Sequence, residues 1–132
     1  MNNIIFLIGR ILLASVFLGA ALNKMGDIPG TQKLMVAHGM SWTGFWLAGA
    51  IVLEILGSLS LIVGFKARFG ALALLVFLVP ATYIGHTDFA NPDNLIHFTK
   101  NLAIMGGLLI VIAFGSGPLS LDARKAPASV DA

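Results

Sequence analysis

Four long apolar stretches divide this chain, and they restrict its fold more than any other feature of the sequence. They cover about residues 4–22, 43–64, 69–86 and 97–115. An α-helix rises ~1.5 Å per residue, so each stretch comes close to the length needed to cross a hydrocarbon core ~30 Å thick. The apolar residues run continuously instead of alternating, which argues against the strands of a membrane barrel. We therefore predict an all-α integral membrane protein whose four spans form one helical bundle.

The composition supports this membrane fold. Of 132 residues, 58% are hydrophobic and 11% are charged, whereas a soluble domain carries about 25% charged residues. The net charge of +2 comes without a clustered basic face, so we expect no nucleic-acid partner. The chain has no cysteine, which excludes disulfides and thiolate metal ligands. Its length allows one domain over residues 1–132.

The first stretch is interpreted as a retained span and not as a cleaved signal peptide. The preceding segment Met1-Asn2-Asn3 has no basic side chain, and Arg10 interrupts the apolar run. Between the spans we expect a Pro29-Gly30 turn followed by a short surface helix over residues 31–38. A tight basic turn over residues 65–68, a turn over residues 91–94 and a polar tail over residues 117–132 complete the chain.

Basic residues outside the spans indicate the orientation of the bundle. The side that would hold both termini carries four of them, and the other side carries three: Lys66, Arg68, Arg124 and Lys125 against Lys24, Lys33 and Lys100. Because two of the first group lie in the tight 65–68 turn, the positive-inside rule places both termini in the cytoplasm. We expect the protein in the inner (plasma) membrane of a bacterium, in contact with the lipid bilayer.

Two ionisable residues lie inside the apolar stretches. Arg10 lies about two turns into the first stretch, and Glu54 lies near the middle of the second. Each would cost several kcal/mol in lipid unless it is paired or faces water. We predict that Arg10 and Glu54 form a buried ion pair that fixes the register of the two spans, with a proton relay as the alternative.

A second set of polar residues lies at the ends of the spans on the side of the membrane away from the two termini. Lys24 ends the first span, His86 ends the third, and Lys100 with Asn101 opens the fourth. We take these four as a candidate binding pocket for an anionic or quinone-like head group. The alternative is ordinary snorkelling of lysines at the membrane interface.

A metal site is not predicted in this region. His86, Asp88 and His97 are suitable residue types, but their positions lack a recognised ligand spacing.

Several motifs resemble those of the DoxX family of small four-span membrane proteins. The first span holds Gly9-Arg10-Ile11-Leu12-Leu13, and the second holds Leu53-Glu54-Ile55-Leu56-Gly57 followed by Gly64-Phe65-Lys66-Ala67-Arg68. The fourth span begins at Lys100-Asn101-Leu102 and is followed by Gly115-Ser116-Gly117-Pro118-Leu119-Ser120-Leu121-Asp122. The resemblance extends from about Ile5 to Asp122. It implies that Arg10, Lys24, Glu54, His86, Lys100 and Asn101 occupy the positions where the family keeps polar groups.

The resemblance also implies a function. Family members resemble the membrane subunit of a thiosulfate:quinone oxidoreductase, and others are linked to redox-stress complexes. We therefore expect a quinone-linked or redox-associated membrane subunit without its own redox centre, with quinone as the one cofactor considered and no catalytic residue assigned. Such a subunit would act with a protein partner or as a homo-oligomer and would not be an enzyme by itself. The alternatives are a scaffold that recruits a redox partner, or a lipid- or solute-handling bundle suggested by a faint repeat of the spans.

Overall fold

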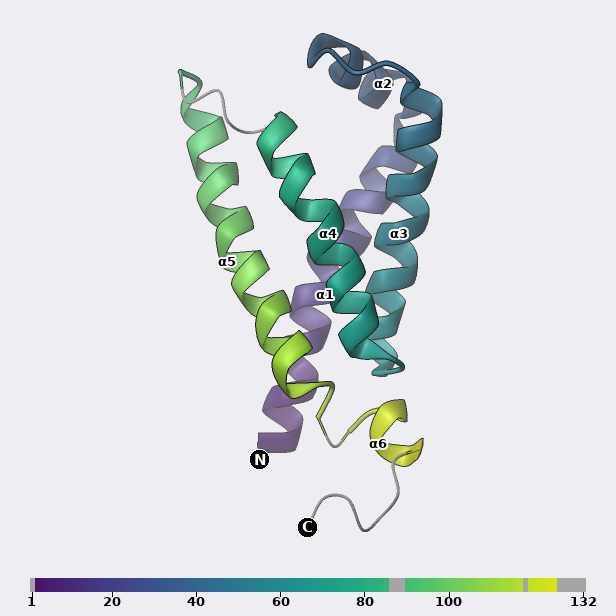
Figure 1. Ribbon diagram of the computed structural model, residues 1–132, viewed down its shortest axis with the longest axis vertical. Helices are drawn as coiled ribbons and strands as arrows, with labels where there is room; N and C mark the ends of the chain where they lie inside the picture. Colours follow the sequence, from purple (N-terminus) through teal and green to yellow (C-terminus); the bar gives the residue numbers. More distant parts are fainter. Residues whose placement is uncertain (1, 86–89, 118, 126–132) are drawn as a thin grey trace.

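The fold is described from a computed structural model, which covers residues 2–85, 90–117 and 119–125 (Figure 1). These residues form helices and no strand. The helices are α1 (Asn2–Gly26), α2 (Ile28–Ala37), α3 (Thr43–Val63), α4 (Ala67–Gly85), α5 (Pro92–Phe114) and α6 (Leu121–Lys125). Four of them, α1, α3, α4 and α5, are long and apolar enough to cross a membrane. The predicted all-α membrane bundle of four spans is therefore confirmed.

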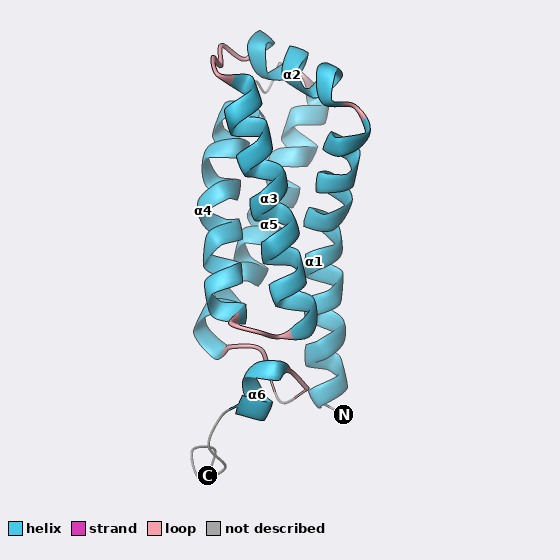
Figure 2. Ribbon diagram, turned by 90° about the vertical axis from the view of Figure 1, so that its right-hand side faces the viewer, coloured by secondary structure: helices cyan, strands magenta, loops and turns pink. Residues whose placement is uncertain are grey.

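Successive spans run antiparallel and pack in chain order. α1 packs on α3, α3 on α4, and α4 on α5, whereas α1 and α5 touch in only a small area. The start of α1, the turn between α3 and α4, and α6 lie at one end of the bundle, which we call the α6 end (Figures 1 and 2). α2 lies across the opposite end, which we call the α2 end. The membrane face at which each end lies stays a prediction.

Small residues let α3 and α4 approach closely. A Cβ atom added to Gly57 of α3 would lie 2.6 Å from Cγ of Leu74, and one added to Gly70 of α4 would lie 2.4 Å from the Ser60 hydroxyl oxygen. Leu74 is fully buried in the core. Close contact between small residues is the usual basis of helix packing in lipid, where no hydrophobic force drives helices together.

Two expected turns are helix starts instead. Asp27 accepts a hydrogen bond from the Gly30 amide at 3.1 Å, so α2 begins at Ile28 and contains the Pro29-Gly30 pair. Proline is tolerated there because the first amides of a helix have no intrahelical partner. The predicted turn over residues 91–94 is also the start of a helix. The Asn91 side chain caps α5 by accepting a hydrogen bond from the Asp93 amide at 3.0 Å. The fourth span consequently begins earlier than the predicted residue 97.

The predicted tight turn between the second and third spans is present. α3 ends at Val63 and α4 begins at Ala67. Gly64 has φ 72° and Lys66 has φ 50°, both in the left-handed region that glycine adopts most readily. This reversal allows α3 and α4 to pack as antiparallel neighbours.

The close contact between α3 and α4 makes a testable prediction. Gly57→Ala should destabilise the bundle by about 1–3 kcal/mol, because the new methyl group overpacks against Leu74. Gly49→Ala on the same helix is the matched control, since a Cβ there meets nothing within 4 Å. Thermal unfolding of both variants in mild detergent, followed by circular dichroism, measures the difference. Equal melting temperatures would show that α3 and α4 are not packed at this point.

Candidate functional site

A buried ion pair lies within the spans. Glu54 occupies the middle of α3, and only 2% of its side chain is exposed. Its Oε1 atom lies 2.8 Å from Nζ of Lys24, which belongs to the last turn of α1. The same Lys24 nitrogen lies 5.9 Å from the centroid of the Phe77 ring on α4, within the range of a cation–π contact. The pair therefore connects three of the four spans.

Lys24 differs from Glu54 in its access to the surroundings. The Lys24 side chain is 24% exposed, whereas its ammonium group binds the buried carboxylate of Glu54. An ammonium group has three hydrogens to donate, and Glu54 receives one hydrogen bond from it. The ammonium group therefore keeps the capacity to donate further hydrogen bonds.

The predicted pairing of Arg10 with Glu54 is corrected by the structure. Arg10 is buried, as expected. However, its guanidinium donates to the carbonyl oxygens of Leu61 at 2.9 Å and Ile62 at 3.5 Å, and also to that of Leu119. The last carbonyls of a helix lack intrahelical partners and form the negative end of its dipole. Arg10 therefore satisfies the end of α3, and Glu54 takes its partner from the other end of α1.

The segment after α5 is fastened to the α6 end of the bundle by Asp122. The two carboxylate oxygens of Asp122 accept from the amides of Lys66 at 2.6 Å and Ala67 at 3.0 Å, which begin α4. One of them also accepts from the Ser116 hydroxyl at 3.1 Å. In addition, the Asp122 amide donates to the Gly64 carbonyl at 2.8 Å. Asp122 belongs to the predicted polar tail, so part of this tail has a structural role. It caps the start of α4 at Ala67, which lies 55 residues earlier in the chain.

The environment of Asp122 lowers its pKa. Burial by itself would raise the pKa of this carboxyl group, but the hydrogen bonds from Ala67, Lys66 and Ser116 and the charge of Arg10 outweigh it. A carboxylate with a lowered folded-state pKa stabilises the fold above its unfolded pKa of ~3.9 and loses that contribution as the pH falls through the folded value.

A second polar contact joins α4 to α5. The Asn101 side-chain amide donates to the Thr82 hydroxyl at 2.9 Å, and that hydroxyl donates to the Leu78 carbonyl at 2.7 Å. Both side chains are buried. Leu78 follows Phe77 directly, so this contact begins on the turn of α4 that Lys24 approaches. The Lys24–Glu54 pair and the Asn101–Thr82 pair thus each form their hydrogen bond inside the bundle.

The contacts described above include two of the four residues predicted to form a pocket, Lys24 and Asn101, and each of the two has a different partner. Lys24 is held by Glu54 and Asn101 by Thr82, whereas Lys100 is exposed and lies 3.4 Å from Nδ1 of His97. His86 lies outside the described residues, as does Asp88 of the rejected metal set. Sequence reasoning missed Thr82 and Phe77, because a single hydroxyl or ring in an apolar span carries no signal of which neighbour it will meet.

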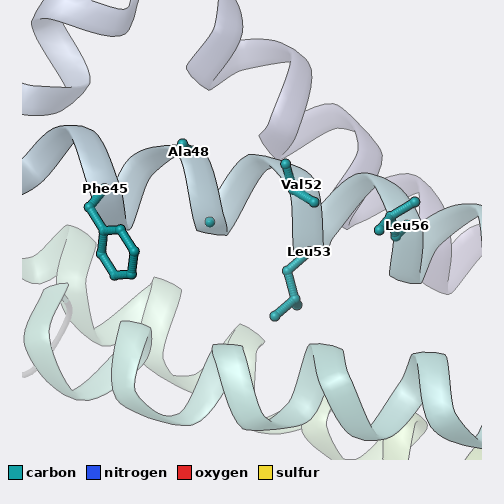
Figure 3. A pocket seen from close by; sticks show the side chains of 6 residues that line it. Phe45, Ala48, Val52, Leu53 and Leu56 are labelled. Carbon is teal, nitrogen blue, oxygen red and sulfur yellow. The ribbon is translucent and has the colours of Figure 1, made fainter.

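A shallow, open groove runs along the outer face of α3, and it is lined by residues of this helix alone. It has a volume of about 520 Å³, and its lining residues are Phe45, Ala48, Gly49, Val52, Leu53 and Leu56 (Figure 3). Leu53 directly precedes Glu54, and Val52 is 54% exposed. The lining side chains are apolar, and Gly49 has no side chain. The groove suits a hydrocarbon chain better than a polar solute.

These features define a four-span helical membrane protein with paired polar groups inside its spans. The DoxX family model matches residues 5–87, and the chain belongs to the DoxX family. The matched part contains both Lys24 and Glu54, so the ion pair lies within the region that defines the family, while Asn101 lies beyond it.

Two similar proteins of Escherichia coli K12 are inner membrane proteins. The chain is 37% identical to inner membrane protein YqjF over 116 residues, which cover 88% of each chain. It is 29% identical to inner membrane protein YphA over 126 residues, or 92% of this chain and 90% of that protein. A Surfeit locus protein 4 homolog of Schizosaccharomyces pombe is 31% identical over 90% of this chain and 37% of its own length. No solved structure matches the chain.

Removing Lys24 should destabilise the bundle more than removing Glu54. Lys24→Met leaves the Glu54 carboxylate buried without its counter-charge, and breaking a buried pair in this way costs about 3–5 kcal/mol. Glu54→Gln keeps an oxygen that can accept from the partly exposed lysine, so its effect should be smaller. The melting temperature in mild detergent measures both changes. Lys100→Met is the matched control, because Lys100 is exposed. If Lys100→Met lowers the melting temperature as much as Lys24→Met does, the stabilising role of the Lys24–Glu54 pair is contradicted.

Asp122 should make the stability of the bundle depend on pH. Asp122→Asn should lower the melting temperature near neutral pH, since a neutral amide cannot replace the carboxylate that accepts from Lys66, Ala67 and Ser116. Because the folded-state pKa is lowered, the gap between wild type and variant should persist down to pH ~4 and close below it. Melting curves over a pH series test this, and a gap that stays constant through acid pH would disprove the role of the charge.

Proposed function

We propose that this protein is the quinone-binding membrane subunit of a redox complex, with no redox centre of its own. The observation that carries the proposal is the Lys24–Glu54 pair, in which a buried carboxylate holds a lysine that is 24% exposed. Membership of the DoxX family and similarity to inner membrane proteins place the chain in a suitable membrane class.

The ion pair is difficult to explain by stability alone. Replacing a buried ion pair with well-packed apolar residues is often neutral or stabilising, so such a pair is weak support for a structural role. Ionisable residues within a span are also expensive in lipid and usually mark a functional site. The partial exposure of Lys24 gives the pair a side that a membrane-dissolved ligand can approach.

The residues around the pair fit the chemistry of a quinone. A bound quinone would supply two-electron redox chemistry together with protons, and its ring oxygens accept hydrogen bonds. Lys24 would donate to such an oxygen, while Glu54 holds the ammonium group in place at 2.8 Å. The Phe77 ring beside Lys24 offers an apolar surface for the ligand ring.

The outer groove of α3 would accommodate the isoprenoid tail. Its six lining residues are apolar or small, and the groove is open along its length, which suits a hydrocarbon chain that stays in contact with lipid. Leu53 belongs to the groove and Glu54 to the ion pair, so one stretch of α3 carries both parts of the proposed site. The tail would remain in contact with the bilayer along the exposed side chains of Val52 and Leu56.

Quinone binding can be tested with the purified protein in lipid nanodiscs. A photoreactive, long-tailed quinone analogue should label the wild-type protein on α3 or α4. Lys24→Met should weaken labelling about tenfold, the loss expected for one hydrogen bond to a charged donor worth about 1.5 kcal/mol.

A glycine pair provides the control for the tail groove. Gly49→Leu should fill the groove and weaken labelling, whereas Gly19→Leu on α1 adds the same side chain at a position where a Cβ also meets nothing within 4 Å. A short-tailed quinone should be insensitive to both variants. Labelling equal to that of protein-free nanodiscs, or unchanged by Lys24→Met and Gly49→Leu, would reject the proposal and favour the alternative of a non-enzymatic scaffold.

A further inference from the structure

The short helix α2 leaves large apolar side chains on its outer side. Leu34 is 63% exposed and Val36 is 61% exposed. Charged Lys33 is exposed beside them, whereas Thr31, Gln32 and Met35 are half-buried. No residue of α2 is buried. A surface helix in water normally turns its apolar residues towards the core and its polar residues outwards. The outer side of α2 therefore suits a medium that is less polar than water.

Aromatic side chains continue this apolar surface into the start of α3. Trp42 is 79% exposed, Phe45 67% and Trp46 54%. The Phe45 and Trp46 rings contact each other edge to face, with their centroids 5.0 Å apart. The two tryptophans are the only ones in the chain, and both lie at the α2 end. Tryptophan is enriched where transmembrane helices meet the lipid head groups.

Trp42 combines an exposed side chain with an unusual backbone conformation. Trp42 adopts the left-handed conformation, with φ 59° and ψ 41°, and its side chain makes no capping hydrogen bond to α3. A bulky residue in this region is unfavourable. Most of the indole surface lies outside the protein, where lipid head groups can contact it.

We propose that α2 together with Trp42, Phe45 and Trp46 forms an interfacial anchor that lies in the lipid head-group region of the leaflet at the α2 end. α2 crosses this end of the bundle instead of extending from it (Figures 1 and 2). The helix that follows it, α3, also exposes apolar side chains, among them Val52 and Leu56. Exposed Lys33 would reach towards lipid phosphates, as lysines do at membrane interfaces.

The anchor has a consequence for the ion pair. α2 begins four residues after Lys24 and contacts both α1 and α3, the two helices that carry Lys24 and Glu54. A helix fixed in the interface, with its apolar side ~5–10 Å into the head-group and acyl boundary, would set the depth of this pair in the bilayer. The inference does not depend on what ligand the pair binds.

The two tryptophans allow a direct test in the full-length protein. It would be reconstituted in phosphatidylcholine vesicles, with Trp42→Phe and Trp46→Phe variants to separate the two emissions. We expect blue-shifted emission that is quenched more by lipid brominated near the head group than by lipid brominated near the chain end, and only weakly by aqueous iodide. Strong iodide quenching of both tryptophans would overturn the proposal.

Cysteine probes test α2 itself, because the chain has no native cysteine. Leu34→Cys, labelled with a polarity-sensitive fluorophore, should report an apolar environment and be quenched by the brominated lipid. Asp93→Cys at the start of α5 is the matched control, since it is an exposed polar site at the same end of the bundle and should be quenched mainly by iodide. A Leu34 probe shielded from both quenchers would mean that a second copy or another protein covers α2, and that outcome also rejects the lipid anchor.

Discussion

The hydrocarbon core of a bilayer supplies no hydrogen bonds, so the polar groups that this chain carries into its spans depend on partners within the bundle. Glu54 is the clearest case, because its carboxylate lies near the middle of α3 and has one cationic partner, Lys24 at 2.8 Å. Arg10 obeys the same requirement by donating to the free carbonyls at the end of α3. Both contacts join α1 to α3, which makes this helix pair the part of the bundle on which the proposed site depends.

The two ends of the bundle are closed by different means. At the α6 end, Asp122 binds the first amides of α4 and holds the segment after α5 against the α3–α4 turn. At the α2 end, a helix with no buried residue lies across the spans. A hydrogen-bonded polar closure suits a surface in water, whereas an apolar closure suits a lipid interface. The polar end is also the one predicted to face the cytoplasm, where basic residues such as Lys66 and Arg68 are favoured.

Most of the fold followed from local properties of the sequence. The continuous apolar stretches indicated four spans, and the basic segment over residues 65–68 indicated the tight turn after the second. The sequence signals at Pro29 and Pro92 predict turns, although both prolines lie in the first turn of a helix, because proline and asparagine favour turns and helix N-termini alike. Only the hydrogen bonds that the Gly30 and Asp93 amides donate to the side chains of Asp27 and Asn91 distinguish the two.

The sequence by itself determined that Arg10 and Glu54 would be buried and would need partners, since the cost of a charge in lipid depends only on its position in a span. The partners were decided by the tertiary structure. Arg10 competes for the carbonyls at the end of α3 as well as for a carboxylate, and the flexible Lys24 side chain can point either to the interface or into the bundle. Which contact forms depends on the axial offset between α1 and α3, and that offset is set by the packing of whole helices.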